Sequence, residues 1–102
     1  MGYDDSLIQI QETEEYSLWF SGLRDRGACA RITRPIHRLR QGNPGDVAPV
    51  GEGVSELRIH YGPGYRVYYV QRGCEIIVLL GGGDKSTQRR DISKARAYAR
   101  LL

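Results

Sequence analysis

Three cationic side chains, Arg58, Arg66 and Lys85, lie close enough along the chain for a small fold to bring them together. Arginine cannot ordinarily act as a base, but its fixed charge stabilises negative charge that develops in a transition state. Such a set suits the cleavage of RNA, in which the substrate's own 2′-hydroxyl attacks the phosphate and forms a phosphorane with extra negative charge. We therefore treat Arg58, Arg66 and Lys85 as candidate catalytic residues.

The same reaction requires one proton to be taken up and one to be given back. Lys85 can exchange protons if neighbouring cations favour its neutral form. His60 and Tyr68, which belong to the same stretch as the arginines, can orient an RNA base or stack on it. These two residues are therefore candidate contacts to the substrate.

Residues 56–70 predict a β-hairpin, because both arms carry β-branched and aromatic residues and Gly62-Pro63-Gly64 between them is a turn. Side chains alternate along a strand, so Leu57 and Ile59 share one face. A register that placed them beside Arg66 would bury a charge among apolar groups, which is costly. The favoured register gathers four side chains on the other face: Arg58, His60, Arg66 and Tyr68. In the alternative interpretation the two arginines are ordinary surface charges, paired with Glu56 or Glu75.

The residues before the hairpin predict a strand and two helices. Residues 5–11 are expected to form the strand, and Thr13 to cap a helix whose apolar stripe is Tyr16, Trp19, Phe20 and Leu23. Asp25 can start a second helix with the apolar face Ala28, Ile32, Ile36 and Leu39, in which Pro35 predicts a kink or an early end. On another side of this helix lie Arg31, Arg34 and Arg38, which form either a solvated face or a set of contacts to RNA phosphates.

The remaining segments complete an expected α+β domain. Residues 41–53 are expected to be irregular, and residues 74–80 to form a central strand covered on both faces. Gly81-Gly82-Gly83 is expected to turn the backbone sharply, before Asp84 caps a helix from Lys85 to about Arg100. The prediction is a small antiparallel sheet with the N-terminal strand next to the final strand. The helices, a helical hairpin and a C-terminal helix, are expected to pack on one side of it.

The expected C-terminal helix adds three polar residues to the candidate site. Gln88 and Asp91 lie one turn apart and can point back toward the basic residues of the hairpin. In the alternative interpretation Asp91 forms an ion pair with Arg58 or Arg66. Arg89, between them, is a further candidate contact to RNA.

Composition favours one domain over residues 1–102 and a polyanionic partner. Thirteen of the fifteen basic residues are arginine, and the net charge is +3. No stretch approaches 18 apolar residues and the acidic N-terminus lacks the pattern of a secretory signal, so we expect a cytoplasmic protein. Cys29 and Cys74 lack a CxxC partner and the two histidines complete no metal spacing, so we expect buried, reduced thiols and neither a metal nor another cofactor.

Several motifs in a fixed order resemble one protein family. They are Trp19-Phe20-Ser21-Gly22-Leu23-Arg24-Asp25, Ala30-Arg31-Ile32, Gly42-Asn43-Pro44-Gly45-Asp46, Glu56-Leu57-Arg58-Ile59, Gly62-Pro63-Gly64-Tyr65-Arg66-Val67-Tyr68-Tyr69, and Gly82-Gly83-Asp84-Lys85-Ser86-Thr87-Gln88 followed by Asp91-Ile92. Nearly the whole chain is similar to the RelE/ParE superfamily of type II toxins. It most resembles the HigB-like "addiction module killer protein" branch, which is related to the phage Gp49 proteins.

This resemblance implies a toxin that is neutralised by a helix-turn-helix, HigA-like antitoxin. Many relatives enter the ribosomal A site and cut mRNA without a metal. By position Arg66 matches the arginine that RelE-type enzymes use at the scissile phosphate, and Arg58 and Lys85 match basic positions before and after it. The functional tyrosine of RelE near the start of the last helix is replaced by Gln88-Arg89-Arg90-Asp91. An acidic residue that HigB-type relatives use nearby makes Asp91 a catalytic candidate.

The resemblance leaves other activities open, because ParE relatives inhibit DNA gyrase and a fold does not determine an activity. The leading hypothesis is a ribosome-dependent mRNA endonuclease. The alternatives are a non-nuclease inhibitor of gyrase and a degenerate toxin that only binds its antitoxin.

Overall fold

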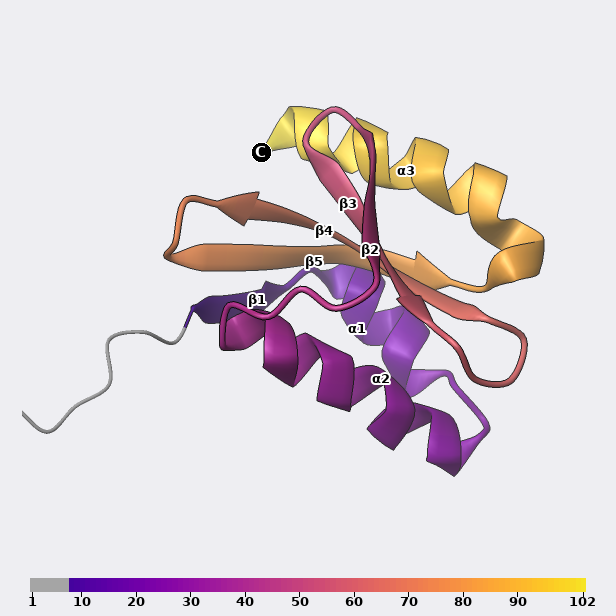
Figure 1. The fold of residues 1–102 in the computed structure, drawn as a ribbon. Helices are drawn as coiled ribbons and strands as arrows, with labels where there is room; N and C mark the ends of the chain where they lie inside the picture. Colours follow the sequence, from indigo (N-terminus) through magenta and orange to yellow (C-terminus); the bar gives the residue numbers. More distant parts are fainter. Residues whose placement is uncertain (1–7) are drawn as a thin grey trace, which may run out of the picture.

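Two long strands with alternating apolar side chains form the centre of the structure, a computed structural model that describes residues 8–102 (Figure 1). They are β3 (Val54–Ile59) and β4 (Tyr65–Arg72), joined by the turn at Gly62-Pro63-Gly64. Arg58 pairs with Arg66, Leu57 with Val67 and Ile59 with Tyr65, so polar and apolar positions face the sides that alternation predicts. The predicted hairpin and its register are confirmed.

The hairpin belongs to a five-stranded sheet with the order β1-β5-β4-β3-β2. β1 (Gln9–Glu12) pairs with β5 (Ile76–Gly83) in parallel, and the other pairs are antiparallel. The N-terminal strand therefore joins the final strand as predicted, but the sheet is mixed rather than wholly antiparallel. The first residues of the predicted strand, 5–7, lie outside the described part of the chain.

The edge strand β2 (Val47–Gly51) is a correction, because this segment was expected to be irregular. It pairs with β3, and its register shifts between Pro49 and Gly51. Proline is tolerated in an edge strand, where one side of the backbone needs no partner. Gly51, Glu52 and Gly53 all have positive φ at the turn into β3. The proline and glycines that suggested a loop are thus the residues of a strand end and its turn.

The two N-terminal helices begin at the predicted caps. α1 (Glu14–Ser21) is capped by Thr13, whose hydroxyl accepts from the Tyr16 amide, and α2 (Arg26–Arg40) is capped by Asp25. α2 continues through Pro35 to Arg40, so the early end that the proline suggested does not occur. The predicted apolar face of α2 is buried: Ala28, Ile32, Ile36 and Leu39.

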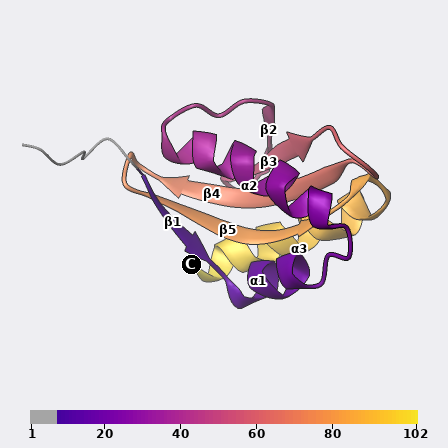
Figure 2. The same ribbon diagram turned by 90° about the horizontal axis from the view of Figure 1, so that it is seen from below.

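Helices cover both faces of the sheet, as the two views show (Figures 1 and 2). α1 and α2 pack on the face that carries Leu57 and Val67, and Trp19 joins this core cluster. α3 (Gln88–Leu101) packs on the opposite face against Tyr68 and other residues. The α+β class is confirmed, whereas the expectation that the helices lie on one side of the sheet is wrong for α3.

A short 3₁₀ helix, η1 (Lys85–Thr87), leads into α3. Asp84 caps this turn, since its carboxylate accepts from the Ser86 amide at 2.8 Å, and the predicted cap is confirmed. Along α3, Ala95 is buried and Ile92 and Ala99 are partly buried against the sheet. Leu102 lies beyond the end of the helix and is 51% exposed.

Gly81, Gly82 and Gly83 continue β5 and do not form the predicted sharp turn. Their lack of side chains makes room for neighbouring helices instead. A Cβ atom at Gly82 would lie 2.3 Å from the Trp19 ring of α1, and one at Gly83 would lie 1.8 Å from the Asp91 carboxylate of α3. The glycines therefore allow α1 and α3 to approach the end of β5 closely.

Both thiols were expected to be buried. This prediction is wrong for Cys74, which is exposed in the turn between β4 and β5. Cys29, in α2, is partly buried. Within residues 8–102 no helix is both long enough and apolar enough to cross a membrane.

We predict that Gly82→Ala destabilises the fold by about 1–3 kcal/mol, because the new methyl group overlaps the Trp19 ring. Gly81→Ala, in the same strand, is the matched control. Its Cβ would lie 3.5 Å from the Glu15 side chain, which is an ordinary van der Waals contact. Urea unfolding of both variants measures the difference. Equal midpoints for the two variants would show that the contact with Trp19 does not constrain Gly82.

Candidate functional site

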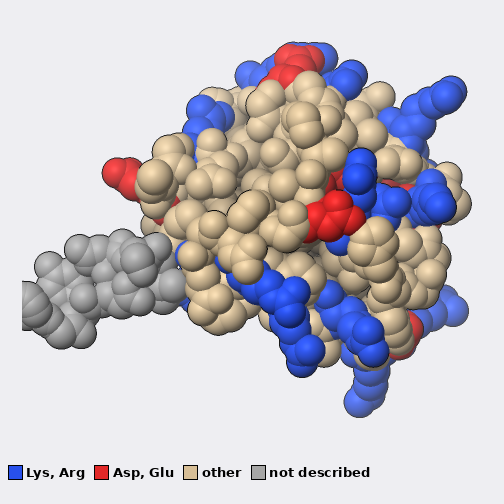
Figure 3. All heavy atoms as spheres, in the orientation of Figure 1, with Lys and Arg blue, Asp and Glu red and all other residues tan. Residues whose placement is uncertain are grey.

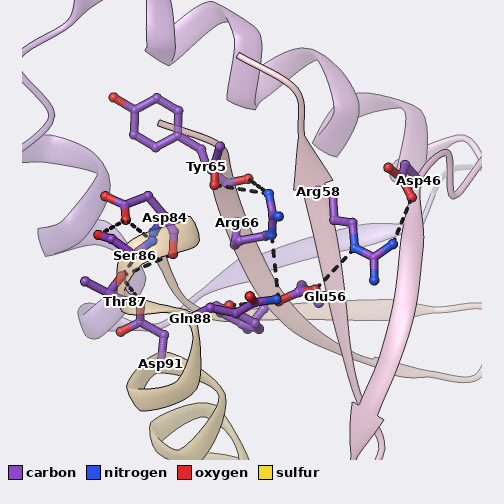
Figure 4. A network of polar contacts seen from close by, with 12 residues as sticks. Asp46, Glu56, Arg58, Tyr65, Arg66, Asp84, Ser86, Thr87, Gln88 and Asp91 are labelled. Atoms are coloured by element: carbon purple, nitrogen blue, oxygen red, sulfur yellow. Dashed lines mark hydrogen bonds and ion pairs between the residues drawn. The ribbon is translucent and has the colours of Figure 1, made fainter. Parts of the chain in front are cut away.

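A buried carboxylate, Glu56, lies at the centre of the predicted site and is only 1% exposed (Figure 4). Its Oε2 accepts a hydrogen bond from the Tyr68 hydroxyl at 3.0 Å and one from Gln88 Nε2 at 2.7 Å. Its Oε1 accepts from Arg58 Nε at 3.3 Å, and Arg66 Nε lies 3.9 Å from Oε2. A carboxylate tolerates such burial only when charges and donors surround it. Glu56 therefore links β3, β4 and α3.

Arg58 and Arg66 face one another across neighbouring strands, on either side of this carboxylate. The Arg66 side chain is only 10% exposed, and its Nη1 donates to the carbonyl oxygens of Gly64 and Tyr65 at 3.1 and 3.3 Å. Its Nε has no hydrogen-bond partner among residues 8–102. Two like charges on opposing positions repel one another. The shared Glu56 anion offsets that repulsion.

The Gly62-Pro63-Gly64 turn brings Lys85 to the same place. The Lys85 amide faces the Pro63 carbonyl oxygen at 3.4 Å. A Cβ atom at Gly64 would lie 3.4 Å from Lys85 Cβ and 3.5 Å from Arg66 Nη1. The stem of Lys85 therefore lies beside the Arg66 guanidinium, and its exposed ammonium extends the basic cluster. A shared catalytic role of Lys85 with Arg58 and Arg66 stays a prediction.

Tyr68 is fully buried beneath α3, with 0% of its surface exposed. Burial and the hydrogen bond to Glu56 raise the pKa of its hydroxyl above the ordinary value. The prediction that Tyr68 stacks on an RNA base is thus contradicted, because its ring has no free face. Its hydroxyl instead supports the Glu56 carboxylate.

Asp91 is also buried, and it lies apart from the basic cluster. Its Oδ2 accepts from the Thr87 hydroxyl at 2.5 Å, and its Oδ1 lies 3.5 Å from Arg90 Nε. The alternative ion pair with Arg58 or Arg66 is not formed, since both arginines pair with Glu56. The carboxylate packs on Gly83 and fixes the start of α3, which does not support direct contact with a substrate.

The two other candidates on α3 have different surroundings. Gln88 is partly buried and reaches Glu56, so it contributes to the site by holding the carboxylate. Arg89 is exposed on the outside of the helix. A role for Arg89 in binding RNA stays a prediction.

His60 lies at the end of β3 with a second acidic residue. Its Nε2 is 2.5 Å from Asp46 Oδ2, and Arg58 Nη1 is 3.6 Å from Asp46 Oδ1. The hydrogen bond from His60 and the nearby Arg58 guanidinium lower the pKa of the Asp46 carboxyl below its usual value, against a smaller opposing effect of desolvation. The side chain of His60 is 75% exposed. Asp46 therefore connects a solvent-exposed imidazole to the arginine cluster.

A groove of about 340 Å³ runs between α2 and this end of β3. Its basic lining comes from both elements: Arg31, Arg34 and Arg38 from α2, and Arg58 and His60 from β3 and its end. The guanidinium carbon of Arg31 lies 4.7 Å from the centre of the Tyr61 ring, and this cation–π contact stabilises one wall of the groove. Figure 3 shows basic side chains along α2 and a second group beside acidic side chains on the same face. The structure thus joins two basic sets that the sequence placed on separate elements.

Sequence reasoning missed the central roles of Glu56 and Asp46. Glu56 was considered only as a surface partner of the arginines, although its position on the polar face of the hairpin indicated that the partnership was possible. Asp46 lies in a segment that predicts a loop and has no hydrophobic periodicity, so no sequence pattern connected it to His60. Its proximity follows from β2, the strand that sequence analysis did not predict, which continues the pairing with β3 as far as the Asp46 carbonyl oxygen and the Arg58 amide.

We predict that Glu56→Ala destabilises the fold by about 3–5 kcal/mol, because it leaves Arg66 buried without a counter-charge. The exposed Glu75→Ala is the control and should change stability by less than about 0.5 kcal/mol. Urea unfolding tests both variants. A Glu56→Ala variant as stable as the control would mean that the carboxylate does not hold the site together.

Comparisons with known proteins agree with this architecture. A sequence model described as "Phage derived protein Gp49-like (DUF891)" matches residues 19–100. A Haemophilus influenzae (strain Rd) protein, described as an uncharacterized protein, is 45% identical over 95 residues, which cover 93% of this chain and 96% of the relative. The match spans α1 to α3 and includes every residue of the basic cluster. The chain therefore belongs to the Gp49-like family of phage-derived proteins, which is associated with RelE- and HigB-like toxins of toxin–antitoxin systems.

Proposed function

We propose that this protein is the toxin of a type II toxin–antitoxin system and that it cleaves mRNA on the ribosome. The observation that carries the proposal is that Arg58 and Arg66 both lie against the buried Glu56, while the stem of Lys85 packs at Gly64 near the Arg66 guanidinium. In this proposal the antitoxin is a helix-turn-helix protein, and the site of action is the cytoplasm, where ribosomes translate. Membership of the Gp49-like family supports the toxin assignment.

The arginine cluster suits a reaction in which negative charge grows on a phosphate. Arg66 is fixed by two backbone carbonyl oxygens and by the charge of Glu56, so its guanidinium needs little reorganisation when the phosphorane forms. The stem of Lys85 packs at Gly64 close to Arg66 Nη1, and its exposed ammonium extends the cluster toward solvent. Arg66 and Lys85 would thus contact the scissile phosphate, while Arg58 lies between them and the groove.

The groove supplies a route for the rest of the RNA strand. Arg34 and Arg38 line it on α2, and Arg58 lines it on the sheet, so phosphates on either side of the cleaved bond would meet fixed cations. Arginine suits this task because its planar donors match phosphate oxygens. Arg34 and Arg38 of α2 are expected to bind substrate without taking part in the chemical step.

We predict that Arg66→Ala and Lys85→Ala each lower the cleavage rate about 10²–10³-fold, because each removes a cation aimed at the developing charge. Arg72→Ala is the control, since Arg72 is an exposed arginine at the far end of the same strand, β4. The assay is a reconstituted translation reaction, in which wild-type protein yields fragments with new 5′-hydroxyl ends in the A-site codon. Full activity of both variants would refute this site.

The reaction itself is tested by expressing the protein alone and mapping RNA ends across the transcriptome. New ends clustered within codons would support cleavage on the ribosome and report the preferred codon. Intact mRNA together with a loss of gyrase supercoiling would refute the proposal in favour of gyrase inhibition. Intact mRNA with normal growth would refute it in favour of a protein that only binds its antitoxin.

We predict that the double variant Arg34→Ala and Arg38→Ala weakens binding to programmed ribosomes but preserves the cleavage rate at saturation. Each phosphate contact on a single strand contributes roughly 0.7 to the slope of log affinity against log salt, so the slope should fall by about 1.4. Arg24→Ala with Arg40→Ala removes the same charge from exposed positions outside the groove and is the matched control. Equal salt slopes for the two double variants would exclude the groove as the path of the RNA.

A further inference from the structure

We propose that His60 is the general base of the proposed RNA cleavage and that Asp46 positions its imidazole. The inference rests on the proposed function and adds the group that takes the proton from the 2′-hydroxyl. His60 directly follows β3, and its Nε2 and Arg58 Nη1 both contact the Asp46 carboxylate, at 2.5 and 3.6 Å, which places the two side chains close together. Its exposed ring lines the groove in which the RNA would lie.

The contact with Asp46 selects one tautomer of the imidazole. Asp46 is held in its ionised form by His60 and Arg58, and an ionised carboxylate can only accept a hydrogen bond. His60 Nε2, 2.5 Å from Asp46 Oδ2, must therefore carry the shared hydrogen. In the neutral ring the free lone pair then lies on Nδ1, as a base requires. The carboxylate also stabilises the imidazolium that forms when Nδ1 takes up a proton.

The other titratable candidates are less suited to this step. Asp91 is buried, accepts from Thr87 and faces away from the groove. Glu56 is buried and engaged by donors from three elements, so it cannot touch a ribose. Lys85 is a cation beside another cation, which suits it to contact the phosphate. His60 is the candidate that combines exposure, a free lone pair and an orienting partner.

The cleavage step moves one proton to His60 and returns one proton to the leaving oxygen. His60 Nδ1 takes the proton of the 2′-hydroxyl, and the 2′-oxygen forms a bond to phosphorus. The bond from phosphorus to the 5′-oxygen then breaks, and that oxygen receives a proton from solvent or from an acid of the site. The products are a 2′,3′-cyclic phosphate and a 5′-hydroxyl. The base does not touch the leaving group, and this separation makes the assignment testable.

The surroundings of His60 are strongly cationic on several sides. The charged groups that face it are Asp46, which precedes β2, Arg58 of β3, and Arg31, Arg34 and Arg38 of α2. Asp46 is the one anion of this set, so it is the group that would stabilise the positive charge on the ring when His60 takes the proton of the 2′-hydroxyl.

The test measures single-turnover cleavage of a ribosome-bound mRNA. We predict that His60→Ala and His60→Gln lower the rate about 10²–10⁴-fold and still bind the ribosome. Gln can donate to Asp46 but cannot act as a base, so it keeps the contact without the chemistry. His37→Ala is the control, because His37 is exposed on α2 outside the groove.

A substrate with sulfur in place of the 5′-oxygen separates the roles of base and acid, since sulfur leaves without a proton. If His60 is the base, His60→Ala stays slow with this substrate. If the sulfur substrate restores His60→Ala to the wild-type rate, the assignment is overturned, because His60 would then be the acid. The assignment is also overturned if His60→Ala cleaves the ordinary mRNA at the wild-type rate. Absence of cleavage by the wild-type protein would refute the proposed function, and the inference with it.

Asp46 is tested as a positioning residue by a double-mutant cycle. Asp46→Asn frees the imidazole to adopt either tautomer and should slow cleavage, though less than His60→Ala does. In the His60→Ala background the same change should have little further effect, because Arg58 is also held by Glu56. Additive losses in the double variant would show that Asp46 does not act through His60.

Discussion

The buried Glu56 carboxylate is the interaction on which the site depends. An isolated carboxylate would be too costly to bury, so its presence requires donors from every element around it. Tyr68 donates from β4, Gln88 from α3 and Arg58 from β3 itself. A one-residue slip of the hairpin would leave this charge in the apolar core on the other face. The requirement to satisfy one anion thus fixes the strand register, the docking of α3 and the direction of the arginines together.

The glycines at the end of β5 also support this site, because they allow α1 and the start of α3 to pack closely on the strand. Side chains at Gly82 and Gly83 would occupy the space of Trp19 and Asp91. Their absence lets α1 and the start of α3 lie directly on the strand, and the start of α3 carries Gln88 to Glu56. The cost is a strand end without side chains to pack, which is offset by the packing of the partly buried Trp19 ring and by the hydrogen bond between Thr87 and Asp91.

The sequence determined most of the fold because its local signals agree with one another. The alternation around Leu57 fixed the register, and Thr13, Asp25 and Asp84 marked the helix starts. The failures have physical reasons. Glycine predicts a turn when only local conformation is considered. At Gly82, however, glycine is required because a side chain would overlap the ring of Trp19, some 60 residues away in the chain. Burial of Tyr68 and Asp91 depends likewise on where α3 packs, which no local pattern specifies.

The candidate site lies at the edge of the sheet rather than on one face. β2 pairs with β3 only as far as Leu57, with one further hydrogen bond from the Arg58 amide to the Asp46 carbonyl oxygen. On this side, away from β4, the end of β3 has no neighbouring strand. Arg58 can therefore bind Glu56 on the α3 side and still line the groove beside α2. A continuous neighbouring strand would have separated the α2 arginines from the cluster around Glu56. Because β2 begins only at Val47, opposite Leu57, basic residues from opposite sides of the sheet can act on one strand of RNA in the proposed function.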